Sequence, residues 1–100
     1  MTGTDVQLDE KIKVNLTEPK MWKVVFLNDD YTPVEFVVSL LIEIFKHDTD
    51  SAMLVTMQVH NQGSGVAGVY SYEIAEAKAV EATNLSKANK FPLQIKIEEE

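Results

Sequence analysis

The sequence predicts an α+β fold, a two-layer sandwich in which a small three-stranded antiparallel sheet packs against three helices. Three observations lead to this prediction. The chain has 100 residues, 45% of them apolar, which suits one domain with a single core. Apolar residues alternate in three short segments, as in strands, and recur at helical spacing in three longer ones. The segments follow one another as β-α-α-β-α-β, an order that suits helices packed on a small sheet.

The first 20 residues mix charged, polar and isolated apolar side chains and end in Glu18-Pro19-Lys20. This pattern supports no long periodic element. We interpret residues 1–20 as a flexible N-terminal arm and residues 21–100 as the core domain. The residues alone leave open whether the arm is a tail without a role or acts on a partner.

The first strand is predicted over residues 21–28, MWKVVFLN, where both alternating sets are largely apolar. Such a strand is either covered on both faces or central in its sheet. A helix is predicted over residues 33–47, with Thr32 as its cap, Pro33 at the first helical position and Glu35 completing a capping box. This helix is apolar around most of its circumference, so it must be covered on more than one side.

A second helix is predicted to begin with Asp48 or Thr49 as its cap and to end at Gly63 and Gly65. The short segment GVAGVYS indicates the second strand. Ser71 can cap a third helix, which is rich in alanine and can therefore lie close to a sheet. The final segment, FPLQIKIEEE, alternates cleanly and predicts a strand with one solvated face.

Composition and charge exclude several classes of function. The formal net charge is −7, which argues against nucleic acid as a partner because a phosphate backbone requires clustered Lys and Arg. The chain has no cysteine, so it has no disulfide and no Cys-ligated metal. No apolar run approaches the ~20 residues of a membrane span, and the N-terminus lacks the apolar core of a signal peptide. We expect a cytoplasmic protein without a membrane segment.

Polar residues with chemical potential lie at the joint between the first strand and the first helix, Asn28-Asp29-Asp30, and on the second helix at His60. No serine lies in a G-x-S-x-G motif, and no metal-ligand spacing or glycine-rich phosphate loop is present. We therefore expect no catalytic residue, metal ion or cofactor. An amide and two carboxylates beside a histidine suit a cationic ligand, and the apolar flanks suit an amphiphile with one positive end. Taken singly, each residue also fits an ordinary turn or helix end.

Four segments together resemble the ClpS family: KVVFLNDDYTPVEFV, VHNQG, GVYSYEIAEAKA and FPL. The resemblance covers roughly residues 20–97. It implies a non-catalytic protease adaptor of the N-degron pathway. Such an adaptor binds the free N-terminal Leu, Phe, Tyr or Trp of a substrate protein. It delivers that protein to the N-terminal domain of the unfoldase ClpA, or of ClpC, for degradation by ClpP. We expect a monomer.

The resemblance also implies roles for individual residues. The substrate α-amino group would be held by the side-chain oxygen of Asn28, a neutral ring nitrogen of His60 and, through an ordered water, Asp30. Asp29 would support the field or the loop geometry. The substrate side-chain pocket would be lined by Phe26, Thr32, Val34, Val37, Thr56, Val59 and Leu93. Glu73 and Lys78 would contact the unfoldase.

Two positions depart from the family pattern, because Val34 and Thr56 stand where methionine is common. A roomier pocket would admit N-terminal Ile or Val; alternatively, neighbouring side chains fill the gap. Two other functions also stay open. One is a small amidase or metal hydrolase that uses Asp29, Asp30 and His60. The other is a ClpS-like fold with a different recognition task, such as docking on the ribosome.

Overall fold

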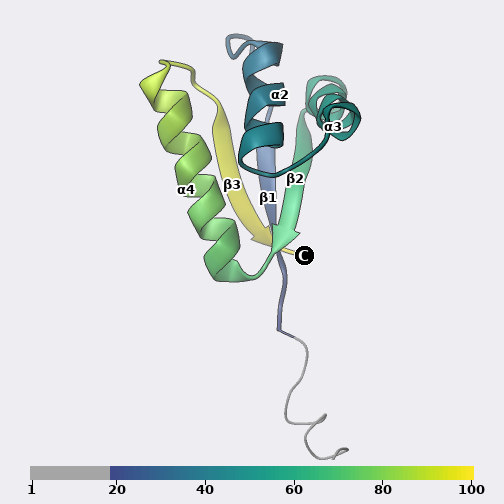
Figure 1. The fold of residues 1–100 in the computed structure, drawn as a ribbon, viewed down its shortest axis with the longest axis vertical. Coiled ribbons are helices and arrows are strands. Elements are labelled where there is room, and N and C mark those ends of the chain that lie inside the picture. The colour runs from purple at the N-terminus through teal and green to yellow at the C-terminus, as the bar shows by residue number, and fades with distance from the viewer. Residues whose placement is uncertain (1–18) are drawn as a thin grey trace, which may run out of the picture.

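The computed structural model describes residues 19–100, and its elements confirm the predicted fold class and order (Figure 1). The predicted arm, residues 1–20, lies outside the described residues except for Pro19 and Lys20. The elements are β1 (Trp22–Leu27), α2 (Val34–Glu43), α3 (Thr49–Gln62), β2 (Ser64–Tyr70), α4 (Tyr72–Ala88) and β3 (Gln94–Glu99).

The sheet is antiparallel, with the strand order β2-β1-β3. The first strand is therefore the central one, which explains why both of its faces are apolar. Val24 and Phe26 are fully buried in the core, and Val25, on the opposite face by strand alternation, is only 6% exposed. Central placement gives β1 backbone partners on both edges and leaves β2 and β3 as edge strands.

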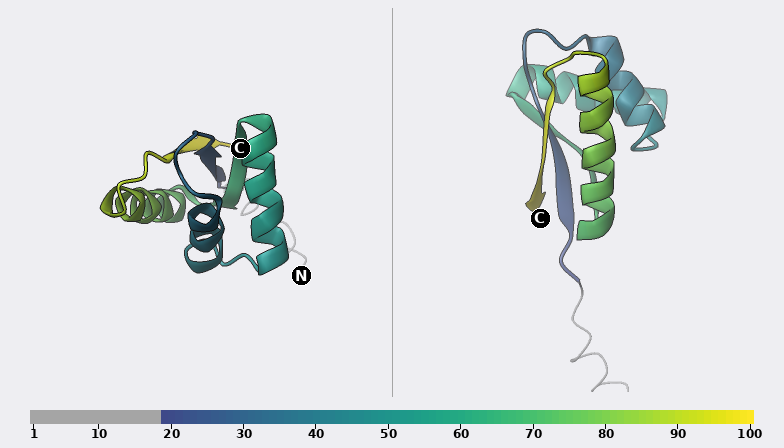
Figure 2. Two further views of the ribbon diagram at one scale, coloured as in Figure 1. Left: turned by 90° about the horizontal axis from the view of Figure 1, so that it is seen from above. Right: turned by 90° about the vertical axis from the view of Figure 1, so that its left-hand side faces the viewer.

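The three helices cover one face of the sheet, with α4 along β3 and β1 and with α3 beside β2 (Figure 2). The core lies between these two layers. Ala75 and Ala82 of α4 are fully buried, so the small side chains that the sequence places on this helix allow its close approach to the sheet. The core side chains are Val24, Phe26, Val37, Leu40, Leu41, Ile44, Phe45, Ala52, Val59, Ala67, Ala75, Ala82 and Leu93.

The predicted start of the first helix is wrong in its capping. Pro33 is the N-cap residue of α2, no side chain caps the helix, and neither Thr32 nor Glu35 forms the expected capping box. The Thr32 hydroxyl instead donates to the carboxylate of Asp29 at 2.8 Å. A capping Thr32 would accept a bond from a backbone N–H of the first helical turn, whereas here its hydroxyl and its own N–H both donate to the Asp29 carboxylate.

The first helix also ends earlier than the predicted residue 47, because Lys46 adopts a left-handed conformation with φ 63°. The second helix matches its prediction at both ends. The Asp48 side chain accepts from the Ser51 N–H at 2.8 Å, and Gly63 closes the helix with φ 92°.

The last two elements differ from prediction only in detail. Ser71 is the N-cap residue of α4, as expected, but its side chain makes no capping hydrogen bond. The final strand begins at Gln94 rather than at Phe91. Pro92 lacks the N–H that a strand ladder uses, which is consistent with the later start.

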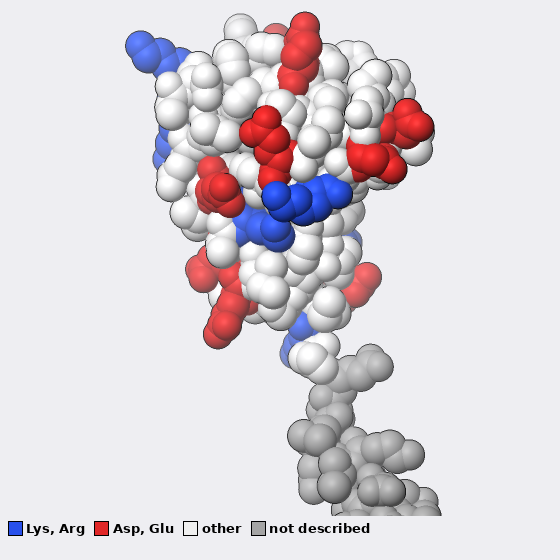
Figure 3. Space-filling model, viewed as in Figure 1, with Lys and Arg blue, Asp and Glu red and all other residues white. Residues whose placement is uncertain are grey.

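The surface seen in Figure 3 carries acidic side chains spread over the helices and a small group of lysines near its centre. No extended basic surface occupies this face of the described residues. Within the same part of the chain, no helix is both long and apolar enough to cross a membrane.

Candidate functional site

The loop between β1 and α2 is organised by Asp29. One carboxylate oxygen accepts from the backbone N–H of Tyr31 at 2.8 Å and of Thr32 at 2.7 Å, and the other accepts from the Thr32 hydroxyl at 2.8 Å. This pattern is an Asx turn reinforced by a side-chain bond. Asp29 therefore shapes the loop, and its carboxylate is already engaged by the protein.

The same contacts set the charge of Asp29. Partial burial by itself raises the pKa of this carboxyl group. The hydrogen bonds from the Thr32 N–H, the Tyr31 N–H and the Thr32 hydroxyl together outweigh burial and hold the pKa below its ordinary value. The carboxylate thus contributes a fixed negative charge to the loop.

The loop is anchored to the end of α3. The backbone N–H of Asn28 donates to the carbonyl oxygen of Gly63 at 2.9 Å, continuing the pairing of Leu27 with Ser64. His60 lies in the last turn of α3, three residues before Gly63. The fold therefore brings Asn28 and the histidine to the same end of the sheet although 32 positions separate them in the sequence.

Three polar side chains at this end make no hydrogen bond within residues 19–100: Asn28, Asp30 and His60. All three residues are exposed. Asp29, between the first two, has all its bonds inside the loop. The two adjacent aspartates thus differ in their contacts: the Asp29 carboxylate is engaged within the loop, whereas the Asp30 carboxylate has no hydrogen-bond partner among residues 19–100.

The predicted pocket residues come from β1, α2, α3, the loop between β1 and α2, and the segment before β3, and most are buried. Phe26 is 0%, Val59 4% and Thr56 5% exposed, whereas Val34 is 53% exposed at the start of α2. The Thr56 hydroxyl donates to the Ala52 carbonyl at 2.8 Å, so its hydrogen bond is made within its own helix. Of the other three residues, Val37 and Leu93 are buried and Thr32 is half-buried.

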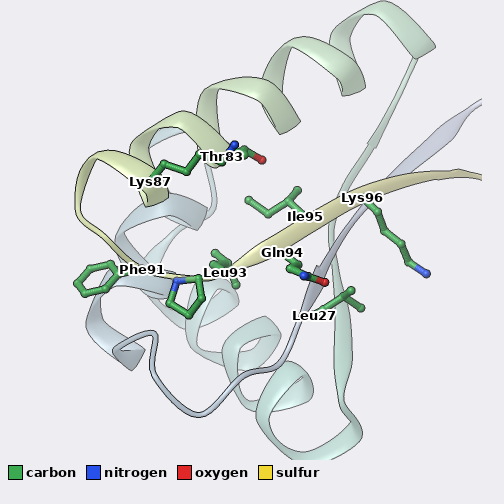
Figure 4. A pocket seen from close by; sticks show the side chains of 9 residues that line it. Leu27, Thr83, Lys87, Phe91, Leu93, Gln94, Ile95 and Lys96 are labelled. Carbon is green, nitrogen blue, oxygen red and sulfur yellow. The ribbon is translucent and has the colours of Figure 1, made fainter.

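The described cavities do not coincide with this predicted pocket. Four cavities described within residues 19–100 include neither Thr56, Val59 nor His60 in their linings. A cavity of about 350 Å³ touches the site at Asn28 and Asp29. A second cavity, of about 460 Å³, includes Leu93 in its lining (Figure 4).

Four residues around the smaller cavity were not predicted as site residues from the sequence: Leu27, Tyr31, Pro92 and Gln94. Tyr31 is 78% exposed. The position of this aromatic residue in a polar loop could have indicated its place beside the site. Nothing in the sequence indicated a place for Pro92 and Gln94 near the site, because only the fold brings the start of β3 beside the β1–α2 loop.

The two predicted unfoldase contacts differ in environment. Glu73 is exposed in the first turn of α4. Lys78 is half-buried, and its ammonium donates to the Ile44 carbonyl at 2.7 Å and lies 5.4 Å from the centre of the Tyr70 ring. Lys78 therefore joins α4 to the end of α2 in addition to any contact with a partner.

His47, the second histidine of the chain, has a structural role, unlike the exposed His60. Nε2 of His47 donates to the Ala67 carbonyl oxygen at 2.6 Å, and Nδ1 lies 2.6 Å from the Ser51 hydroxyl. Both ring nitrogens are thus engaged. In the part of the chain that the structure describes, no group of three or more His, Asp or Glu side chains is arranged to hold a metal ion.

Comparison with known proteins places this arrangement in a family. The family described as "ATP-dependent Clp protease adaptor protein ClpS" matches residues 17–96. The ClpS adapter protein of Wolinella succinogenes is 39% identical over 97 residues, covering 97% of this chain and 95% of its own length. That of Gluconobacter oxydans is 46% identical over 83 residues, covering 83% and 70%.

A solved structure is similar throughout the described fold. Agrobacterium tumefaciens ClpS2 bound to L-phenylalaninamide matches with a TM-score of 0.80 and 47% identity, over 83% of this chain and all of that chain. Its fold agrees with the β-α-α-β-α-β order and the three-stranded sheet described above. From the family match, the relatives and this structure together, we conclude that the chain belongs to the ClpS family of ATP-dependent Clp protease adaptor proteins.

Proposed function

We propose that this protein binds the free N-terminal residue of proteins destined for degradation and delivers them to a Clp unfoldase. The main observation is that Asn28, Asp30 and His60, at one end of the sheet, are exposed and that their side chains have no hydrogen-bond partner among residues 19–100. An amide oxygen, a carboxylate and a neutral imidazole nitrogen all accept hydrogen bonds, and an α-ammonium group donates three. Asp29 fixes the loop that presents them.

The ligand of the similar Agrobacterium protein supports this proposal. L-phenylalaninamide has a free α-amino group, one large apolar side chain and an uncharged amide where a peptide would continue. It is therefore a minimal copy of an N-terminal phenylalanine. For this chain we propose the same class of ligand, namely N-terminal Leu, Phe, Tyr and Trp. The walls of its side-chain pocket would be Phe26, Thr32, Val34, Val37, Thr56, Val59 and Leu93.

The recognition requires two contributions. Burial of one large apolar side chain contributes about 1.5–3 kcal/mol. Each hydrogen bond to a charged group contributes about 1.5–3 kcal/mol. Micromolar binding corresponds to about 8 kcal/mol. A large side chain and a satisfied ammonium reach that value together and not separately, so an internal Leu or a blocked N-terminus should not bind.

A matched pair of peptides tests the proposal. A fluorescent peptide with a free N-terminal Phe is expected to bind, and its acetylated copy is not, because acetylation removes both the charge and the donors. Fluorescence anisotropy measures both affinities. Equal affinities would exclude recognition of the amino group.

The same peptide separates an adaptor from an enzyme. We propose that the protein is non-catalytic, as its relatives are called adapter proteins. Mass spectrometry of the peptide after prolonged incubation is expected to find it intact. Cleavage that disappears on His60→Ala substitution would instead favour the hydrolase alternative.

Delivery would use the exposed start of α4. We propose that Glu73 and Lys78 contact the N-terminal domain of ClpA or ClpC. Glu73 is the cleaner probe, because it is exposed and makes no hydrogen bond or ion pair with another described residue. A Glu73→Lys variant is expected to retain peptide binding and to lose binding to the isolated unfoldase domain.

A further inference from the structure

A groove runs between α4 and the edge strand β3. It consists of two cavities of about 460 Å³ and 310 Å³ that share three lining residues, Thr83, Ile95 and Lys96. Figure 4 shows the side chains of α4 and β3 that border the first cavity. The second cavity continues along the same helix past Val80, which is 51% exposed. The groove is thus a continuous surface that extends along β3 from Gln94 to Ile97.

The backbone of β3 is unpaired on the side of this groove. The strand pairs only with β1. The N–H of Glu100 bonds to the carbonyl of Met21, and hydrogen-bonded positions alternate along an antiparallel pair. The N–H and C=O groups of Ile95, Ile97 and Glu99 therefore point away from β1. The hydrogen bonds described for residues 19–100 give these groups no other partner.

The groove is continuous with the site proposed for the α-amino group. The cavity of about 350 Å³ beside Asn28 shares Leu27, Pro92 and Gln94 with the first groove cavity. A polypeptide that begins at Asn28 can therefore cross Pro92 and enter the groove at Gln94 without leaving a concave surface. It would then run in the same direction as β3.

We propose that this run of cavities binds the extended segment that follows the first residue of a substrate, as a further strand on the free edge of β3. The inference rests on the proposed function, since the segment is placed by its N-terminus. Backbone groups of the segment pair with those of Ile95 and Ile97, and every second side chain enters the groove beside Thr83. At about 3.3 Å per residue, the six residues of β3 match about six substrate residues.

Two ligands separate the two sites. L-phenylalaninamide occupies only the first-residue site, whereas a peptide of about ten residues, beginning with Phe and continuing with alternating Val and Ser, also reaches the groove. Titration calorimetry with the full chain is expected to give at least about fivefold tighter binding of the peptide. Thr83→Arg, which fills the groove, is expected to remove this gain and to leave phenylalaninamide binding unchanged.

Matched variants make the test specific. Ala77→Arg places the same charge at an exposed position of α4 outside the described cavities and should behave as wild type. Val80→Arg, at the exposed end of the groove, should act as Thr83→Arg does. Retained phenylalaninamide binding shows that each variant is folded.

Three results would overturn the inference. The first is equal affinity of wild type for the two ligands. The second is a peptide affinity that Thr83→Arg and Ala77→Arg change alike. The third is wild-type dimerisation, measured by analytical ultracentrifugation, that Thr83→Arg abolishes, which would assign the groove to a second copy. Failure of phenylalaninamide to bind wild type would reject the proposed function itself, and the inference with it.

Discussion

At the scale of single residues, Asn28 has separable roles for its backbone and its side chain. Its N–H holds the loop to Gly63, and this bond survives substitution of the side chain. Asn28→Ala is expected to weaken binding of a free N-terminal Phe peptide about ten- to a hundredfold, the equivalent of one hydrogen bond to a charged group. Fluorescence anisotropy measures the loss. The control is Asn61→Ala, because Asn61 is an exposed asparagine near the end of α3. Equal losses of affinity in the two variants would contradict the role of the Asn28 side chain.

Asp29 predicts a pH dependence of stability. Its pKa is lowered in the folded protein, so the ionised carboxylate stabilises the fold above the unfolded value near 3.8. This contribution is lost as pH falls through the lowered folded pKa. Asp29→Asn keeps the shape without the charge. Urea unfolding is expected to show wild type more stable than Asp29→Asn near neutral pH, with the difference vanishing at the acid end. A difference that persists there would contradict the assignment.

The identities of Val34 and Thr56 lead to a prediction about which N-terminal side chains the proposed pocket admits. Both are shorter than the methionine common in the family, and Val34 is 53% exposed at the start of α2. Peptides beginning with Ile or Val are expected to bind within about tenfold of a Leu peptide, and Val34→Met is expected to increase that difference. Competition anisotropy measures the series. A hundredfold preference for Leu in wild type would mean that neighbouring side chains close the gap.

At the scale of elements, Lys78 connects α4 to α2. Its ammonium bonds to a carbonyl beyond the last turn of α2, where a cation also complements the helix dipole. Lys78→Met is expected to lower the free energy of unfolding by about 1–2 kcal/mol in urea. Lys87→Met, on the same helix but without a described bond, should change it little. Equal free energies of unfolding for the two variants would mean that Lys78 does not stabilise the fold and that its role is limited to partner binding.

The glycines between α3 and β2 show how an element-level prediction can be right for an incomplete reason. The sequence-based prediction assigned both Gly63 and Gly65 to the end of the second helix. Only Gly63 has a left-handed φ, of 92°. At Gly65, a Cβ would lie 2.8 Å from Cγ2 of Val59, so this glycine allows the strand to pack against the helix. A close approach between elements leaves no local signal, because the neighbour is defined only by the fold.

At the scale of the whole molecule, the predicted N-terminal arm, residues 1–20, lies almost entirely outside the described residues. Of its two interpretations, a tail without a role or a segment that acts on a partner, we propose the second, with a role in delivery. Deletion of residues 1–18 is expected to leave the affinity for a Phe peptide unchanged within about twofold. The same deletion should slow degradation of a Phe-starting reporter by the reconstituted unfoldase and protease. Unchanged degradation would mean that the arm has no role in transfer.

Much of the fold and part of the site could be predicted from the sequence. Alternation and helical spacing are local properties, so the order of elements, the central apolar strand and the Asp48 and Gly63 helix ends follow from them. The capping of α2 did not follow, because the Thr32 hydroxyl can either accept from an N–H of the helix or donate to the Asp29 carboxylate. The choice depends on the position of the Asp29 carboxylate in three dimensions.

The sequence by itself determined the fold class and, through the resemblance of its motifs, the family and the residues proposed to hold a substrate. Only the tertiary structure decided which hydrogen bonds engage the Asp29 carboxylate, that Lys78 is engaged within the fold, and that a groove continues from Asn28 along β3. The physical reason is the same in each case. Hydrogen-bond partners and concave surfaces arise between segments that are distant in the chain, and residue spacing records only what is near.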